Sequence, residues 1–397
     1  MEGIIPVTEN TFWLGVNDYE SKLFEAIWPL PDGISYNSYI ILDNKVAVID
    51  TVKRGFIPAY IDKIKNLLNG RRIDYLVINH IEPDHSDATK ILSELFPEMQ
   101  IIGNEKTANF LKYFYNMEKN IKIIKDDEEI SLGSHKIRFL ITPMVHWPET
   151  MITYDETTKV LFSGDLFGGY GALPGGIFDD EVDLAFFDKE MLRYFSNIIG
   201  KYSIMVQKAI SRVRDLDIDF VASAHGPVFR KNPRHVIDLY DRWSRYETEA
   251  GVVLIYASMY GNTERMANAI ANAISKEHGK IKVYNLSKTD ISFIVPEIWR
   301  FKALILGCPT YNTKLFPLMG NLIRIIENDN IANHLIGIFG TYGWSGGAVS
   351  ALKEFAQKGN WKLIDPVIEA KCSPTEEDLK NCEILGRNIA RLLYSGD

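Results

Sequence analysis

Cysteine is scarce in this chain of 397 residues, where it occurs only as Cys308, Cys372 and Cys382. The three residues form no CxxC pair. The sequence therefore predicts no disulfide framework, no zinc knuckle and no fused four-cysteine iron site, which would need two such pairs. This cysteine usage is typical of a protein in a reducing cytoplasm.

Excess positive charge and long hydrophobic runs are also missing. Lysine and arginine number 44 against 52 aspartates and glutamates, a formal net charge of −8 that makes nucleic acid a poor partner. The start, MEGIIPVTEN, has no basic segment followed by an apolar run, so we expect no signal peptide. Glycines and hydroxyl residues interrupt the longest uncharged stretch, 335–352, so we expect no membrane span.

The composition is that of an ordinary globular protein, and the length predicts two domains. Near residue 250 a charged segment of helical period, 234–250, gives way to a fully apolar strand, 251–258. We therefore predict one domain at 1–249 and a second at 250–397.

The second domain alternates short apolar strands with helical patterns, which predicts a doubly wound parallel sheet. Its expected strands are 252–258, 280–286, 301–310, 334–343 and 361–370, and its expected helices are 262–276, 316–328, 346–358 and 375–393.

The first domain has many strands and few crossover helices, which predicts a mixed αβ sandwich. Its expected strands are 38–50, 73–80, 100–103, 135–143, 151–155, 159–165 and 219–226, with helices at 57–69 and 87–96.

Potential metal ligands follow several strands of the first domain. Four of them lie within six residues after one buried strand, where an extended backbone would point His80, Glu82 and Asp84 to one side. Alone, each would be a satisfied polar group, a turn residue or a helix cap. Together they predict a metal site, and they are also our catalytic candidates: His80, Glu82, Asp84, His85, His146, Asp165 and His225.

This pattern resembles the metallo-β-lactamase fold, whose signature HxHxDH is followed by a later histidine, aspartate and histidine. Glu82 stands where zinc hydrolases of that fold usually carry histidine. The set then contains four histidines and three carboxylates, with Asp165 placed to bridge two metals. Sites of this kind suit iron, because the additional carboxylate stabilises the ferric state.

A phosphate-binding loop is predicted at 258–263, between the first strand and first helix of the second domain. Backbone N–H groups at a helix start and hydroxyl side chains would hold the anion. The segment SMYGNT lacks the lysine of a P-loop, and the absence of GxGxxG disfavours a dinucleotide. It resembles the FMN-phosphate loop of flavodoxins; a plain helix cap is the alternative.

Two later strand-end loops, 309–312 and 341–346, would converge on the same crevice, because ligands of doubly wound sheets lie outside the carboxyl ends of the strands. Aromatic residues of these loops could cover a flat isoalloxazine ring. The predicted FMN-binding residues are Ser258, Met259, Tyr260, Gly261, Asn262, Thr263, Pro309, Thr310, Tyr311, Asn312, Thr341, Tyr342, Gly343, Trp344, Ser345 and Gly346.

The two domains together resemble the flavodiiron proteins, or A-type flavoproteins, in the minimal class without a rubredoxin extension. The resemblance implies FMN and two non-haem irons as cofactors. One iron, nearer the flavin, would be held by His80, Glu82 and His146. The other would be held by Asp84, His85 and His225, with Asp165 bridging. Family members differ in whether the residue at His85 reaches the metal. Tyr194 either lies near this pocket or is a core aromatic.

The implied activity is reduction of O2 to water by four electrons, reduction of NO to N2O by two, or both. The resemblance also implies a head-to-tail homodimer or a dimer of dimers. A separate electron donor is implied as well: a rubredoxin, a flavodoxin-type protein or reduced deazaflavin.

Two alternatives remain at the level of sequence. The first is a dinuclear zinc hydrolase of the lactamase type fused to a flavodoxin-like module, which Glu82 argues against and which metal analysis separates. The second is a pure electron carrier with FMN as its only centre, for which Asp165→Asn would leave activity unchanged.

Overall fold

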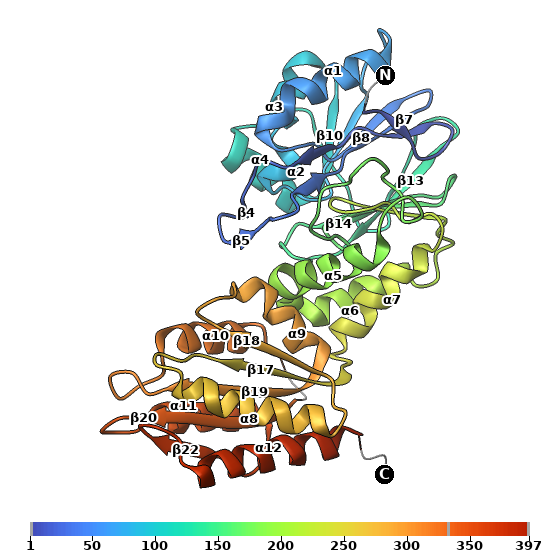
Figure 1. Ribbon diagram of the computed structural model, residues 1–397. Helices are drawn as coiled ribbons and strands as arrows, with labels where there is room; N and C mark the ends of the chain where they lie inside the picture. The colour runs from blue at the N-terminus through green and yellow to red at the C-terminus, as the bar shows by residue number, and fades with distance from the viewer. Residues whose placement is uncertain (1–2, 332–333, 395–397) are drawn as a thin grey trace. The chain divides into compact units, whose positions relative to one another are not determined.

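The computed structural model describes residues 3–331 and 334–394, which form two compact units, Met1–Ser244 and Arg245–Asp397. Figure 1 shows strands and helices interleaved along the chain in both. Every described helix is too short or too polar to cross a bilayer.

The first unit contains two main sheets. The larger has the order β1-β2-β7-β8-β9-β10-β11, antiparallel from β1 to β8 and parallel from β8 to β11. Its strands are β1 (Ile5–Pro6), β2 (Thr11–Trp13), β7 (Tyr39–Leu42), β8 (Val46–Ile49), β9 (Tyr75–Val77), β10 (Gln100–Gly103) and β11 (Ile121–Ile123).

The smaller sheet has the order β12-β13-β14-β15-β16 and is antiparallel except for its last pair. Its strands are β12 (Glu129–Ser131), β13 (Lys136–Ile141), β14 (Met151–Asp155), β15 (Val160–Gly164) and β16 (Phe220–Ser223). Two small hairpins add β3 (Val16–Asp18) with β6 (Ile34–Tyr36), and β4 (Leu23–Phe24) with β5 (Trp28–Pro29).

The two sheets pack face to face through one apolar core. Ile49 and Val77 of the larger sheet share a buried cluster with Phe139 and Phe162 of the smaller sheet. Since side chains alternate across a strand, the opposite face of each sheet is left for helices. These helices are α1 (Ile57–Leu68), α2 (Pro83–Ser86), α3 (Thr89–Leu95), α4 (Glu105–Tyr115), α5 (Leu184–Tyr194), α6 (Ser203–Val213) and α7 (Pro233–Ser244).

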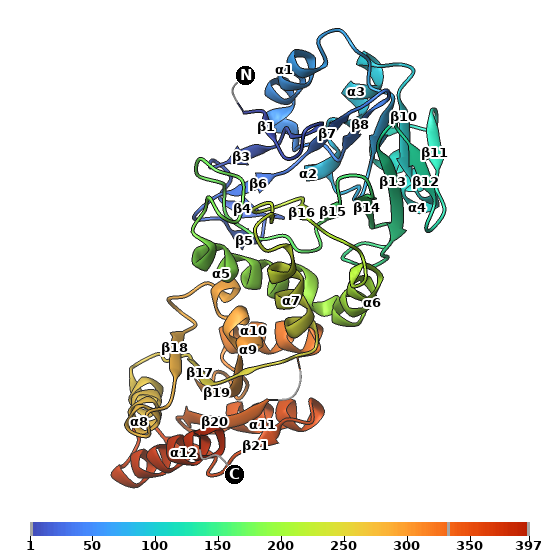
Figure 2. The same cartoon turned by 90° about the vertical axis from the view of Figure 1, so that its right-hand side faces the viewer.

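The second unit is built on one parallel sheet of order β18-β17-β19-β20-β21, with β22 also paired to β20. In Figure 2 this sheet separates α8 and α12 from α9, α10 and α11. Apolar residues of α8 and α12 pack on Leu254 and Ile305, which holds that face together. The strands are β17 (Glu249–Tyr256), β18 (Ile281–Asn285), β19 (Phe301–Pro309), β20 (Leu335–Tyr342), β21 (Lys362–Leu363) and β22 (Ile368–Lys371). The helices are α8 (Asn262–Lys276), α9 (Val295–Arg300), α10 (Pro317–Asn328), α11 (Ala348–Lys358) and α12 (Glu376–Tyr394).

Three expectations about local structure were wrong. The fifth strand of the second unit, predicted as 361–370, is divided into β21 and β22 around Pro366, which has no N–H for a ladder. The strand predicted at 38–50 is a hairpin that turns after Leu42. The segment after His80 is extended only as far as Glu82, because Pro83 begins the single turn of α2.

Candidate functional site

The first group of potential metal ligands contains His80, Glu82, His146 and Asp165, which lie on the segments that follow β9, β13 and β15. Nε2 of His80 lies 3.1 Å from Oε2 of Glu82, and Nε2 of His146 lies 3.2 Å from the same oxygen. Asp165 completes this group with Oδ2, which is 3.0 Å from His146 and 3.6 Å from His80. One ligand atom from each of the four residues lies within 4.8 Å of the others.

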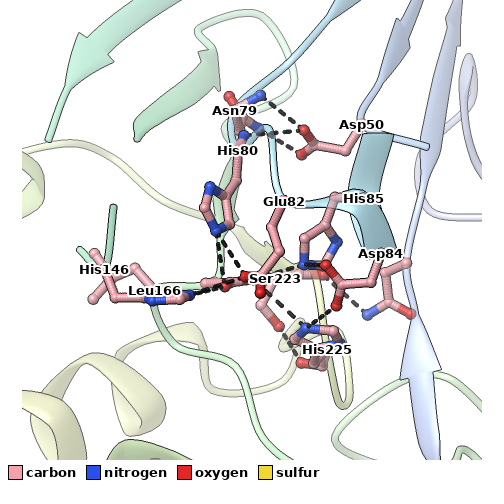
Figure 3. A network of polar contacts seen from close by, with 12 residues as sticks. Asp50, Asn79, His80, Glu82, Asp84, His85, His146, Leu166, Ser223 and His225 are labelled. Carbon is pink, nitrogen blue, oxygen red and sulfur yellow. Dashed lines mark hydrogen bonds and ion pairs between the residues drawn. The ribbon is translucent and has the colours of Figure 1, made fainter. Parts of the chain in front are cut away.

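The second group lies beside the first and contains Asp84, His85 and His225. Nε2 of His85 lies 3.3 Å from Oδ1 of Asp84, and Nε2 of His225 lies 3.5 Å from Oδ2 of that residue. Figure 3 shows Asp84 and His85, which are neighbours in α2, converging with His225, which follows β16. The helical turn of α2 points Asp84 into this group and away from the first.

Asp165 faces both groups. Its second oxygen, Oδ1, lies 3.0 Å from His85 Nε2 and 3.6 Å from His225 Nε2. A single buried carboxylate therefore directs one oxygen to each group, as a bridge between two cations would require. All seven ligand candidates are brought together by the fold.

Charge within the cluster is concentrated and buried. Burial opposes the charged form of Asp165, yet His85, His146 and His80 hold the pKa of this carboxyl well below its usual range. Burial lowers the pKa of His85 and His146, but neighbouring carboxylates more than offset this and raise each to about 9. Burial and the neighbouring His85 lower the pKa of His225 to about 4. A site with this affinity for positive charge binds cations when its histidines release their protons.

The polar atoms left without partners test whether cations fit here. Within the described part of the chain, both carboxylate oxygens of Asp84, Oδ1 of Asp165, and Nε2 of His85 and of His225 are buried and form no hydrogen bond, although they make ion-pair contacts of 3.0 to 3.6 Å with one another. Such groups are rare in folded proteins unless water or an ion satisfies them. Imidazole nitrogens and carboxylates are also the donor set of a non-haem diiron site, so the residues fit the two irons.

Further residues hold the ligand loops in place. Asp50, which follows β8, accepts hydrogen bonds from the backbone N–H of Asn79 at 2.7 Å and from its side-chain amide at 3.1 Å. Glu149 accepts from His80 Nδ1 at 2.7 Å, and the backbone carbonyl of Ser35 accepts from His225 Nδ1 at 2.7 Å. Neither Asp50 nor Glu149 was predicted from the sequence as a site residue. The available signals were that Asp50 stands at a strand end and that Glu149 follows the ligand His146 by three residues.

A hollow of about 720 Å³ reaches one carboxylate of each group, Glu82 and Asp84, and Glu25 of the β4–β5 hairpin also lines it. Burial and the nearby Glu82 raise the pKa of Glu25 to about 7. Glu25 was not predicted from the sequence as a site residue. The ring of Tyr194 is fully buried, with its centroid 5.5 Å from that of His225. Both predicted alternatives for Tyr194 therefore hold, since it is a core aromatic beside the cluster.

The second unit has a pocket of about 430 Å³ at the carboxyl ends of β17, β19 and β20. Its walls come from the three predicted loops and from Cys372, which the sequence analysis did not include. Of the predicted FMN residues, Gly261, Ser345 and Gly346 do not line it. The lining residues are Ser258, Met259, Tyr260, Asn262, Thr263, Pro309, Thr310, Tyr311, Asn312, Thr341, Tyr342, Gly343, Trp344 and Cys372.

One end of this pocket fits a phosphate. Gly261 precedes the first turn of α8 at φ +85°, and a Cβ built there would have no described atom within 4 Å. No side chain of the described residues caps this turn, so its first N–H groups are free for an anion. The buried Thr263 hydroxyl lies 3.0 Å from the Thr341 hydroxyl and ties two of the loops together.

Exposed aromatic side chains in the walls of this pocket fit a planar aromatic group. Trp344 and Tyr260 are 84% and 89% exposed, and Tyr311 is 43% exposed, so their rings are open to a ligand. Flat aromatic surfaces of this kind stack on flavin rings at little entropic cost. The free N–H groups at the start of α8 and the exposed aromatic rings together fit the phosphate and the ring system of FMN.

Comparison with known proteins gives matches over both units. Residues 34–226 match the family described as ODP family beta lactamase, and residues 254–386 match the flavodoxin family. The nitric oxide reductase of Moorella thermoacetica is 32% identical over 97% of this chain and 98% of its own. The structure of rubredoxin oxygen:oxidoreductase from Desulfovibrio gigas has a TM-score of 0.94 at 27% identity, covering 99% of each chain. That of the flavodiiron protein from Giardia intestinalis has a TM-score of 0.94 at 27% identity, covering 99% of this chain and 97% of its own.

Proposed function

The chain belongs to the flavodiiron proteins, and on this premise we propose that it is an oxidoreductase that reduces O2 to water, NO to N2O, or both. The observation that carries the proposal is the placement of Asp165, with one oxygen toward each of two histidine-and-carboxylate groups. Two metal ions held by these residues would supply two adjacent centres for a small molecule, which suits multi-electron chemistry.

In the proposed assignment, His80, Glu82 and His146 hold one iron, Asp84, His85 and His225 hold the second, and Asp165 bridges them. When bound, the iron pair supplies electrons and substrate-binding positions, and FMN supplies two further electrons. Glu82 supports iron over zinc, because a carboxylate at this position lowers the charge of the site. A zinc hydrolase would have no use for the pocket of the second unit.

The pocket of the second unit is the proposed FMN site. The first turn of α8 would hold the phosphate, with the hydroxyl of Thr263 as an additional donor. Tyr311 and Trp344 would cover the ring, and the open face at Gly343 would let the backbone approach its polar edge.

Electron transfer requires flavin and iron to be close, and we propose that a head-to-tail homodimer, alone or as a dimer of dimers, achieves this. Exposed apolar side chains near both sites support such an interface, because large apolar patches commonly mark protein contacts. Leu23 and Ile27 are exposed near the metal centre, and Met259 and Trp344 are exposed at the flavin pocket. Sedimentation velocity checks this part of the proposal, since a monomer would contradict it.

A separate electron donor in the cytoplasm completes the proposal. A rubredoxin, a flavodoxin-type protein and reduced deazaflavin are the candidates. The name of the Desulfovibrio gigas relative favours a rubredoxin among them.

The test is a stopped-flow mixing of the fully reduced, iron- and FMN-loaded protein with O2 and, separately, with NO. Rapid reoxidation by O2 without peroxide release identifies an oxygen reductase, and rapid reoxidation by NO with N2O formation identifies a nitric oxide reductase. Slow flavin oxidation with peroxide release in O2, together with no reaction in NO, would contradict the proposal. Metal analysis that finds two zincs per chain would contradict it as well.

A further inference from the structure

We propose that Glu149 is a positioning residue that makes the two metal positions unequal in affinity. Its carboxylate is hydrogen-bonded to the ligand His80, whereas the hydrogen-bonded ligand histidine of the second group, His225, has only a neutral carbonyl as its partner. The inference rests on the proposed function, because it concerns how the same two ions are held. It assigns no step of the reaction to Glu149, which does not belong to either group of metal ligands.

The contacts of Glu149 orient the His80 ring. Oε1 of this fully buried carboxylate lies 2.7 Å from His80 Nδ1 and also accepts the backbone N–H of Ile81 at 3.1 Å. An ionised carboxylate only accepts hydrogen bonds, so the His80 proton belongs on Nδ1. The lone pair of Nε2 is then directed toward Glu82 and Asp165, at 3.1 and 3.6 Å, where a cation would lie.

Neighbouring groups hold Glu149 itself. The side-chain amide of Asn104, the residue that caps α4, donates to the backbone carbonyl of Glu149. The ring of Trp147 lies edge-on to His80, with centroids 5.2 Å apart, and restricts the imidazole from another side. Glu149 is therefore placed by secondary structure and packing independently of any metal.

Among the described residues, no carboxylate is hydrogen-bonded to Nδ1 of a histidine in the second group. Nδ1 of His225 donates to the neutral carbonyl of Ser35 at 2.7 Å, and Nδ1 of His85 has no hydrogen-bond partner among the described residues. A carboxylate behind a ligand histidine increases its basicity and commonly contributes ten- to a hundredfold in metal affinity. The ion held by His80, Glu82 and His146 should therefore bind more tightly than its neighbour.

The chain offers a matched control in a second buried carboxylate–histidine pair. Oδ2 of Asp155 also lies 2.7 Å from His135 Nδ1, and both residues are buried in the same unit. Neither of them belongs to the groups of potential metal ligands. Asp155→Asn therefore removes a comparable charge from the interior without touching the proposed centre.

The test measures Co²⁺ binding to the metal-depleted full-length protein, by optical titration in competition with a chelator. For Glu149→Gln we expect one of two binding steps to weaken about tenfold and the other to stay unchanged; for Glu149→Ala the loss in that step approaches a hundredfold. Asp155→Asn should leave both steps as in the wild type. In ⁵⁷Fe-loaded protein, Glu149→Gln should shift one of the two Mössbauer signals only.

Equal weakening of both steps, no weakening of either, or the same change in Asp155→Asn would overturn the inference. Its failure is separable from that of the proposed function. If the wild type binds two ions and reduces O2 or NO, and Glu149→Gln binds both ions with unchanged affinity, only the inference fails. If the wild type binds two ions and Glu149→Gln weakens only one binding step, but the wild type turns over neither gas, only the proposed function fails. A wild type that does not bind two ions overturns both.

Discussion

Oδ1 of Asp165 lies 3.0 Å from Nε2 of His85, although these residues are far apart in the sequence, His85 lying in α2 and Asp165 directly after β15. The other oxygen of the same carboxylate lies 3.0 Å from His146. Asp165 is 1% exposed, so no water competes for its oxygens from outside. The charge of this one side chain is thus shared between two groups of histidines.

Asp165→Asn should abolish the bridge, because an amide offers only one oxygen and no charge to two cations. We expect the iron content to fall from two per chain to one or less, and turnover with O2 or NO to fall by about a hundredfold or more. Iron analysis and stopped-flow turnover check this. Asp155→Asn serves as the control and should keep both irons; unchanged turnover in Asp165→Asn would favour an electron carrier that uses FMN alone.

Glu82→His should shift the metal preference of the site toward zinc. The substitution replaces the carboxylate near His80 and His146 with an imidazole and restores the motif of the zinc hydrolases. In protein produced with equal iron and zinc, we expect the iron-to-zinc ratio to fall several-fold by elemental analysis. Glu82→Gln separates the loss of charge from the gain of a histidine. A ratio that Glu82→His leaves unchanged would show that this position does not select the metal.

Trp344→Ala should weaken FMN binding about tenfold, since the exposed indole is placed to stack on the ring and such contacts contribute about 1 kcal/mol beyond burial. Titration of the flavin-depleted protein, followed by quenching of FMN fluorescence, measures the change. Tyr113→Ala is the matched control, because Tyr113 is 81% exposed in the first unit and far from this pocket in sequence. Equal affinity in wild type and Trp344→Ala would place the ring elsewhere.

The His135–Asp155 pair should make stability depend on pH. In the folded state, the hydrogen bond that His135 Nδ1 donates to Asp155 raises the pKa of His135 above its usual value of about 6.5. Its stabilising effect is therefore fully present below about pH 6.5 and is lost as the pH rises through the folded-state pKa.

Urea unfolding of wild type and His135→Gln at pH 6 and pH 9 measures this dependence. The difference in free energy of unfolding between the two proteins should be larger at pH 6. At pH 6 we expect Asp155→Asn to cost about 2 kcal/mol, as expected for loss of a buried hydrogen bond to a charged group. A difference that is the same at both pH values would show that His135 is not charged in the folded protein.

Local patterns predicted most of the parallel sheet of the second unit. The helical pattern at 262–276 predicted the bounds of α8, and the alternation of strand and helix predicted the doubly wound topology. These features depend on neighbours within a few residues, which a sequence displays directly. The interruption at Pro366 could also have been read from the sequence, because proline has no N–H to donate.

The amino-acid sequence by itself determined the ligand types, since histidines and carboxylates at strand ends indicated two metals and Glu82 indicated iron. The division of these ligands into two groups followed only from the family resemblance, and its physical cause came from the tertiary structure, in which the turn of α2 carries Asp84 away from Glu82. The tertiary structure alone identified Glu149, whose contact with His80 joins residues 69 positions apart. Such contacts depend on how two sheets pack, and no local period in a sequence encodes that packing.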